Sequence, residues 1–152
     1  MNRTQVASLV LSAAALVGIV AHEGYSEKAY FPVPGDVPTI GFGTTTDVKI
    51  GDKTNPIKAL DRALKDVSKF EGAIKQCVTA PLHQFEYDAF VSLSYNIGAR
   101  AFCGSTLVRK LNALDYAGAC RELLKWDRFQ GGQLRGLTIR REAEFKKCSG
   151  QD

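Results

Sequence analysis

Two stretches of the chain decide its fold: Glu23-Gly24-Tyr25-Ser26-Glu27-Lys28-Ala29-Tyr30 and Pro38-Thr39-Ile40-Gly41-Phe42-Gly43. The first places a carboxylate where an apolar helix is expected to end, and the second predicts a short strand rich in glycine. Partial removal of a carboxyl group from water raises its pKa and lets it donate a proton near neutral pH. An acid of this kind suits cleavage of a glycosidic bond. Glu23 is therefore the candidate general acid.

The spacing of these residues resembles the phage lysozymes of glycoside hydrolase family 24. That family's signature is a Glu, eight residues, an Asp or sometimes a Cys, five residues and a Thr. Here Glu23 and Thr39 match, but Pro32 occupies the position of the second carboxylate and the chain is one residue longer before Thr39. Asp36 is the only carboxylate between Tyr30 and Thr39, so it is the candidate for the displaced second carboxylate. The alternative for Asp36 is ordinary turn chemistry, because Gly-Asp is a common turn dipeptide.

Further matches to the family extend over most of the chain. They imply an α+β, lysozyme-like fold in which a small β-hairpin lobe and a larger helical lobe are joined by a long helix. A polysaccharide is then expected in the cleft between the lobes. The matching segments are residues 82–98, Ser105-Thr106-Leu107, Lys110-Leu111-Asn112, Trp126 and residues 136–144.

The implied activity is that of an endolysin muramidase, which hydrolyses the β-1,4 bond between N-acetylmuramic acid and N-acetylglucosamine in peptidoglycan and lyses the host cell. In this mechanism Glu23 protonates the glycosidic oxygen, Asp36 supports the positive charge that develops on the sugar, and Thr39 orients a water molecule or that carboxylate. Two alternatives stay open. A lytic transglycosylase needs only one acid, which the proline at position 32 favours, and a noncatalytic wall-binding module needs none.

Three further residues, Tyr30, Asn96 and Arg140, are candidates for substrate binding. The amide of Asn96 is able to donate and accept hydrogen bonds to a sugar, and its alternative role is to cap a helix C-terminus. Arg140 is suited to hold acidic groups of the wall, and its alternatives are a solvated helix face or an internal salt bridge.

The composition suits one soluble globular domain of 152 residues, with 45% apolar and 24% charged residues and a net charge of +4. The chain has no run of five basic residues and no zinc or helix-turn-helix spacing, so nucleic acid is not expected as a partner. No cofactor or metal is expected, and the protein is expected to be a monomer. The basic residues from Arg100 onward form either a plain solvated face or one that attracts an acidic polymer such as the cell wall.

An uncharged run extends from Thr4 to Ala21, with Arg3 before it. Its length is marginal for spanning a bilayer. A cleavable signal peptide fits poorly, because cleavage near Ala21 would remove the helix that positions Glu23. A buried first helix remains an alternative. We favour a signal-anchor-release segment like that of a subset of phage endolysins, with residues 1–22 as an apolar helix that visits the inner membrane and residues 23–152 as the catalytic domain. Release would then complete the site by a population shift.

Four cysteines have no metal-binding spacing, which favours structural disulfides over four buried free thiols. Disulfides persist in the periplasm and not in a bacterial cytosol, so export to the host periplasm is expected, with tethering to the membrane before release. Three pairings are possible. We favour Cys103 with Cys120, which would join adjacent helices, and Cys77 with Cys148, which would join the chain end to the long helix.

Two helices are predicted from capping signals and periodicity. Asn55-Pro56 starts one, and apolar residues at steps of three and four continue it to Cys77. A second follows Pro81 and ends at Gly98. Between Thr39 and Lys53 the Gly- and Thr-rich segment predicts a short antiparallel sheet.

Overall fold

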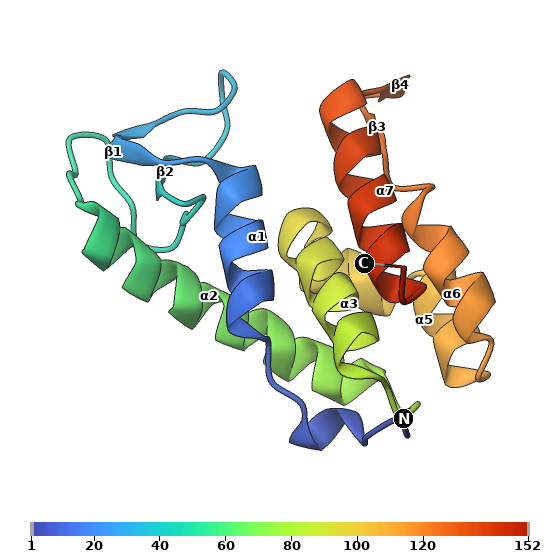
Figure 1. Cartoon of the computed structure of the whole chain (residues 1–152). Helices are drawn as coiled ribbons and strands as arrows, with labels where there is room; N and C mark the ends of the chain where they lie inside the picture. The colour runs from blue at the N-terminus through green and yellow to red at the C-terminus, as the bar shows by residue number, and fades with distance from the viewer. Residues whose placement is uncertain (1, 152) are drawn as a thin grey trace. The chain divides into compact units, whose positions relative to one another are not determined.

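The computed structural model describes residues 2–151 and divides them into two units. Residues 16–69 form the first, which we call the hairpin unit, and residues 2–15 and 70–151 form the second, the helical unit. Two helices, α1 (Ala13–Glu23) and α2 (Pro56–Cys77), contribute residues to both units. The mixture of helices with small antiparallel sheets is the α+β class expected from the sequence (Figure 1).

The hairpin unit contains the antiparallel pair β1 (Ser26–Tyr30) and β2 (Thr39–Gly41). Ser26 lies opposite Gly41 and Tyr30 opposite Thr39, so β1 has an irregularity between these two pairs. All three residues of β2 are buried, whereas much of β1 is exposed. The short antiparallel sheet expected after Thr39 is therefore confirmed, with β1 as its partner strand.

The long helix α2 begins as predicted. Asn55 Oδ1 accepts a hydrogen bond from the backbone N–H of Lys58 at 2.9 Å, and Pro56 takes the first helical position, where no N–H is needed. The apolar stripe predicted for this helix is only partly buried. Three of its residues in the first half are exposed, Ile57, Leu60 and Leu64, whereas Val67 of the same stripe is buried. Ala59 and Ala63 are the other buried residues in this half.

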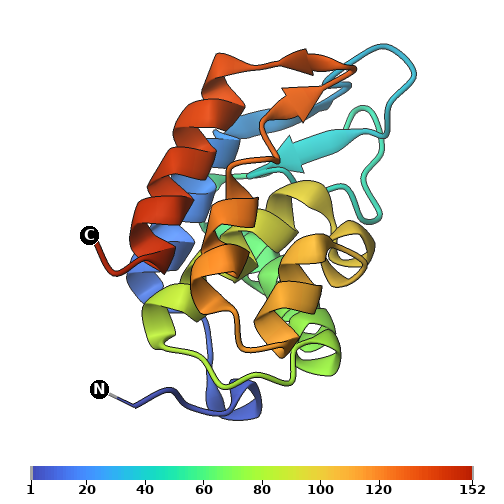
Figure 2. The same ribbon diagram turned by 90° about the vertical axis from the view of Figure 1, so that its right-hand side faces the viewer.

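The helical unit is built from α3 (Gln84–Ile97), α4 (Ala99–Cys103), α5 (Thr106–Asn112), α6 (Tyr116–Leu123) and α7 (Arg135–Cys148). Helix α3 packs against α7, and α6 packs against both α5 and α7. A second hairpin, β3 (Arg128–Phe129) and β4 (Gly132–Gln133), lies at the N-terminal end of α7 (Figure 2). The predicted C-terminal end of α3 is confirmed, because Gly98 is its C-cap with φ of 93° and donates its N–H to Ser94 O.

The uncharged N-terminal run is not one helix in this structure, contrary to the expectation for residues 1–22. A short 3₁₀ helix, η1 (Val6–Ser8), is followed by extended backbone at Leu9, and α1 starts only at Ala13. The break has a physical cause. Carboxylates accept the backbone N–H groups of Leu11 and Ser12, and the Ser12 hydroxyl accepts the Ala15 N–H as an N-cap. Among residues 2–151, no helix is both long enough and apolar enough to cross a bilayer.

All four cysteines form disulfides, as expected, but the expected pairing is wrong. Cys77 bonds to Cys103 and Cys120 bonds to Cys148, with Cα atoms 5.6 and 5.7 Å apart. The end of α2 lies beside the end of α4, since Cys103 Sγ also contacts the carbonyl of Ala73. Helix α6 packs on α7, so Cys120 meets the C-terminal end of α7.

Candidate active site

Glu23 is the last residue of α1 and has a half-buried side chain. The next residue, Gly24, has a φ of +70° and donates its N–H to Val20 O at 3.1 Å. Glycine adopts this left-handed conformation without the steric cost of a Cβ, and it commonly ends a helix in this way. The Glu23-Gly24 pair therefore stops the helix at the acid and directs the chain into β1.

A tight turn holds Gly43 against the Glu23 carboxyl group. Ile40 and Thr44 exchange two backbone hydrogen bonds of 3.0 Å across the turn, and Gly43 within it has a φ of +87°. A Cβ added to Gly43 would lie 3.1 Å from Glu23 Oε2. The backbone of Gly43 therefore packs directly on the acid, and the Gly-Phe-Gly sequence is the signal that indicates so close an approach.

Two further contacts fix this turn within the hairpin unit. Thr44 is buried, and its hydroxyl donates to Asp66 Oδ2 on α2 at 2.7 Å. The rings of Tyr25 and Phe42 pack with centroids 5.3 Å apart. Since Tyr25 lies two residues after the acid and Phe42 one residue before Gly43, this aromatic pair joins the two segments that meet at Glu23.

Thr39 and Tyr30 lie opposite each other in the β1–β2 hairpin. Tyr30 is the last residue of β1, so this pair lies at the end of the strand away from Glu23. Thr39 is buried, and its hydroxyl donates to the Val37 carbonyl at 3.4 Å. Tyr30 is 44% exposed. Thr39 opens the strand β2, which leads directly into the turn at Gly43, so it belongs to the same small framework as the acid.

Asp36 lies in the exposed loop between β1 and β2. Its carboxylate accepts the backbone N–H of Val37 at 2.8 Å, and its own N–H donates to Val33 O at 3.1 Å. These are the local contacts of turn chemistry. A catalytic role for Asp36 stays a prediction.

Asn96 and Arg140 belong to a buried network on α3 and α7 in the helical unit. Asn96 does not cap α3; its Oδ1 accepts a hydrogen bond from Arg141 Nη1 at 3.0 Å. Arg140 is buried, and its Nε lies 3.4 Å from Glu144 Oε1, which makes it part of an internal ion pair. Arg141 is fully buried and its Nε lies 2.7 Å from Glu144 Oε2. Ser92 donates its hydroxyl to the same carboxylate at 2.6 Å.

Burial raises the pKa of Glu144, and the charge of Arg141 and the hydrogen bond from Ser92 oppose that rise. The sequence pattern identified Arg140 as a candidate site residue but did not identify Arg141 and Glu144, which belong to the same network. The paired Arg140-Arg141 followed by Glu144 is the signal for them, since residues three and four apart on a helix face each other.

The described geometry offers one half-buried carboxyl group packed on a glycine turn, which is the arrangement of a proton donor in a polysaccharide hydrolase. This places the chain in the class of lysozyme-like glycoside hydrolases. The phage lysozyme family model matches residues 20–144. The chain belongs to the phage lysozyme family, and it is an endolysin muramidase that acts on peptidoglycan.

Individual relatives agree with this assignment. The chain is 37% identical over 140 residues to a SAR-endolysin of Pseudomonas phage phiKMV, and the match covers 90% of this chain and 86% of the relative. Among solved structures, the endolysin from Escherichia coli O157:H7 phage FAHEc1 matches with a TM-score of 0.81 at 33% identity, covering 93% and 94% of the two chains. The muramidase domain of SpmX from Asticaccaulis excentricus matches with a TM-score of 0.85 at 28% identity, covering 92% and 97% of the two chains.

Proposed function

We propose that Glu23 is the general acid of this muramidase and protonates the glycosidic oxygen between N-acetylmuramic acid and N-acetylglucosamine. The supporting observation is the close approach of Gly43 to the Glu23 carboxyl group, since an added Cβ would lie 3.1 Å from Oε2. In the proposed mechanism Asp36 supports the charge that develops on the sugar, and Thr39 orients a water molecule or that carboxylate. Tyr30, Asn96 and Arg140 contribute to substrate binding.

Mass spectrometry of fragments released from purified peptidoglycan tests the acid. Wild-type protein should release fragments with muramic acid at a reducing end, and Glu23→Gln should lower the rate by about 10²-fold or more, as expected for loss of general acid catalysis. A circular dichroism spectrum of the variant checks its fold. Retained activity in a folded Glu23→Gln protein would overturn the assignment.

The second carboxylate is tested separately, because Pro32 removes the family's residue at that position. Asp36→Asn preserves the hydrogen bond to the Val37 N–H and removes only the charge. A large fall in kcat would support the catalytic role of Asp36. An unchanged kcat would mean that Asp36 serves only to stabilise the turn. Anhydro ends on the products, lighter by one water, would instead identify the lytic transglycosylase.

We also propose that the enzyme is exported to the host periplasm and that residues 4–21 lie in the inner membrane before release. Similarity to a SAR-endolysin supports export. The exposure of Val10 and Val17, at 66% and 65%, supports the membrane stage, because these side chains contribute little to the folded core and their apolar character suits lipid.

Val10→Lys tests the membrane stage. A lysine near the centre of the run costs about 2.5–3.5 kcal/mol in lipid, whereas an exposed position in the folded protein tolerates it. Cell fractionation should show less protein in the membrane fraction for Val10→Lys than for wild type. Equal membrane fractions would contradict tethering by this run.

Sedimentation of the purified protein tests the proposal that the protein is a monomer.

A further inference from the structure

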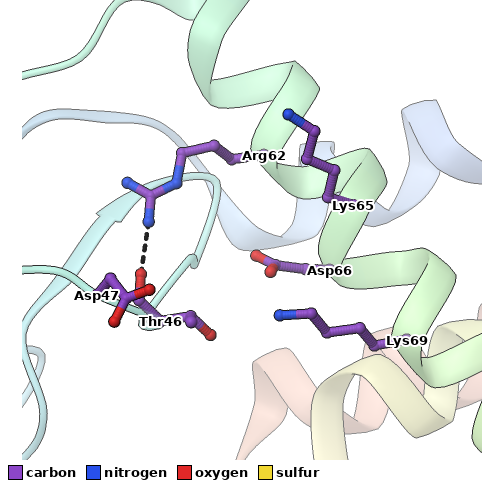
Figure 3. Close-up of a pocket in the computed structure, with 6 residues that line it drawn as sticks. All are labelled: Thr46, Asp47, Arg62, Lys65, Asp66 and Lys69. Carbon is purple, nitrogen blue, oxygen red and sulfur yellow. Dashed lines mark hydrogen bonds between the residues drawn. The ribbon is translucent and has the colours of Figure 1, made fainter.

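An open pocket in the hairpin unit is lined by Thr46 and Asp47 from one segment and by Arg62, Lys65, Asp66 and Lys69 from α2. We call it the basic pocket. The side chains of Arg62, Asp66 and Lys69 extend toward the side on which Thr46 and Asp47 lie, whereas the ammonium group of Lys65 points away from these two residues (Figure 3). The spacing of three and four residues between Arg62, Lys65 and Lys69 places their cations on one face of the helix.

The charges of the basic pocket favour an anion. Three cationic side chains face two carboxylates, and Asp66 already accepts the hydroxyl of Thr44 at 2.7 Å. Lys65 pairs with Asp61 at 2.7 Å, but the two side chains are 71% and 59% exposed. A surface pair of this kind is weak, so the ammonium group is available to a second carboxylate at little cost.

The loop side of the pocket is fixed rather than adaptable. Arg62 Nη2 donates to the backbone carbonyl of Thr46 (Figure 3). The preceding turn is held by the hydrogen bond from the Thr44 hydroxyl to Asp66. Arg62 therefore supports the loop, which leaves Lys65 and Lys69 as the cations best placed to meet a ligand. A ligand site with a fixed wall loses less conformational entropy on binding.

The basic pocket lies close to the acid along the chain. Gly43 packs on the Glu23 carboxyl group, and Thr46 follows three residues later, so a fully extended chain would separate them by only about 10 Å. The lactyl group of the substrate's muramic acid carries a peptide stem through an amide bond, and residues of that stem carry free carboxylates. A stem of three extended residues spans about the same 10 Å, so its carboxylates are able to reach the pocket while the sugar lies at Glu23.

We infer that the basic pocket binds carboxylates of the peptide stem, with Lys65 and Lys69 as the residues that select acidic peptidoglycan. This inference rests on the proposed function, since it requires the glycan to be cleaved beside Glu23. It adds a recognition site for the peptide part of the substrate to a site that acts on the sugar part.

The test compares two walls with the same glycosidic bonds: native peptidoglycan, and the same material with its carboxylates converted to neutral amides. The measured quantity is kcat/KM for the release of reducing ends. Wild type should act on native wall about threefold to tenfold better than on amidated wall, as expected for two exposed charge contacts. The Lys65→Gln/Lys69→Gln double variant should bring this ratio close to 1. Asp47→Asn, which removes a repelling carboxylate and keeps a residue tolerated at the φ of 56°, should raise the ratio.

Lys58→Gln is the matched control, because Lys58 lies on the same helix and outside the lining of the pocket. It should keep the wild-type ratio. An equal change in the control and the double variant would show a general charge effect and overturn the inference. A wild-type ratio of 1, with reducing ends released from both walls, would overturn it while the proposed function stands. No reducing ends from either wall would contradict the proposed function itself.

Discussion

Glu23 and Gly43 constrain each other at the scale of single residues. The acid needs a neighbour without a side chain, because a Cβ at Gly43 would lie 3.1 Å from its carboxylate oxygen. The turn also needs a positive φ, which an L-residue adopts only with strain. These two requirements coincide at one position, so Gly43 is a positioning residue for the acid.

Gly43→Ala is therefore expected to lower kcat by about 10²-fold, since a displacement of a reacting group by about 1 Å costs this much. Hydrolysis of purified peptidoglycan measures the effect. The matched control is Gly131→Ala, because Gly131 has a similar φ of +81° and no atom within 4 Å of an added Cβ. Both variants introduce backbone strain, but only Gly43→Ala crowds the acid. Equal losses of activity in the two variants would contradict the positioning role.

At the scale of elements, carboxylates hold the N-terminal segment in the helical unit. Arg3 makes an ion pair of 2.7 Å with Glu86, and its guanidinium lies 3.5 Å from the ring centroid of Tyr116. Thr4 and Leu82 exchange backbone hydrogen bonds of 2.8 Å. The Ser12 hydroxyl donates to Asp88 at 2.6 Å. A segment inserted in lipid would form none of these contacts, so under the proposed membrane stage they would stabilise only the released protein.

Arg3→Ala tests this docking. Glu86 is buried and would keep only its hydrogen bond from the His83 N–H, so the free energy of unfolding should fall by about 1.5–3 kcal/mol. Urea unfolding of the purified protein gives the measurement. The control Arg100→Ala removes an exposed arginine from α4 and should change stability by no more than about 0.5 kcal/mol. A loss in Arg3→Ala no larger than in this control would show that the ion pair does not hold the segment.

An ion-pair cluster joins α5 to α6 and gives stability that depends on pH. Lys110 and Lys125 lie 2.6 and 2.8 Å from Glu122, and their hydrogen bonds lower the pKa of that carboxyl group below its ordinary value of 4.5. An acid whose folded-state pKa is depressed contributes stability above its unfolded pKa and loses it as pH falls through the folded value. The contribution is therefore present at pH 7, begins to fall near the ordinary value of 4.5 and is lost only as pH falls through the lower pKa of the folded state.

Glu122→Gln should reduce stability at pH 7 and lose less stability than wild type on acidification from pH 5 to pH 3. Urea unfolding at both pH values provides the two differences. The exposed Glu142→Gln variant on α7 controls for the loss of one carboxylate without this cluster. An acid-induced loss that is the same in Glu122→Gln and wild type would contradict the assigned cause.

At the scale of the whole molecule, the sequence predicted those features that depend on neighbouring residues. Asn55-Pro56 and Gly98 mark helix ends through local hydrogen bonds and backbone conformation, and both are confirmed. The α+β class followed from the resemblance to a family. The break in the N-terminal run was not predicted, because its cause is the carboxylates of Glu71 and Asp88, which are more than fifty residues away in sequence.

The pairing of the cysteines failed for the same reason. Spacing along the chain does not indicate which helix ends meet, and the packing of α6 on α7 decides that Cys120 meets Cys148. At the candidate site, the motif alone was enough to identify Glu23 as the candidate general acid. The buried role of Arg140 required knowledge of Glu144 on the same helix and of Ser92 on α3.

Both disulfides lie in the helical unit, and the last prediction concerns their effect on the whole protein. Each bond closes a loop of similar length, with sequence separations of 26 and 28 residues, and such a loop stabilises by about 3.5 kcal/mol. Loss of one bond should lower the free energy of unfolding by about 3.5 kcal/mol and loss of both by about 7 kcal/mol, a large fraction of the ~5–15 kcal/mol by which a domain of this size is stable. Urea unfolding of Cys77→Ser/Cys103→Ser, of Cys120→Ser/Cys148→Ser and of the variant with all four changes tests this. Full stability of the last variant would show that apolar packing alone sustains the helical unit.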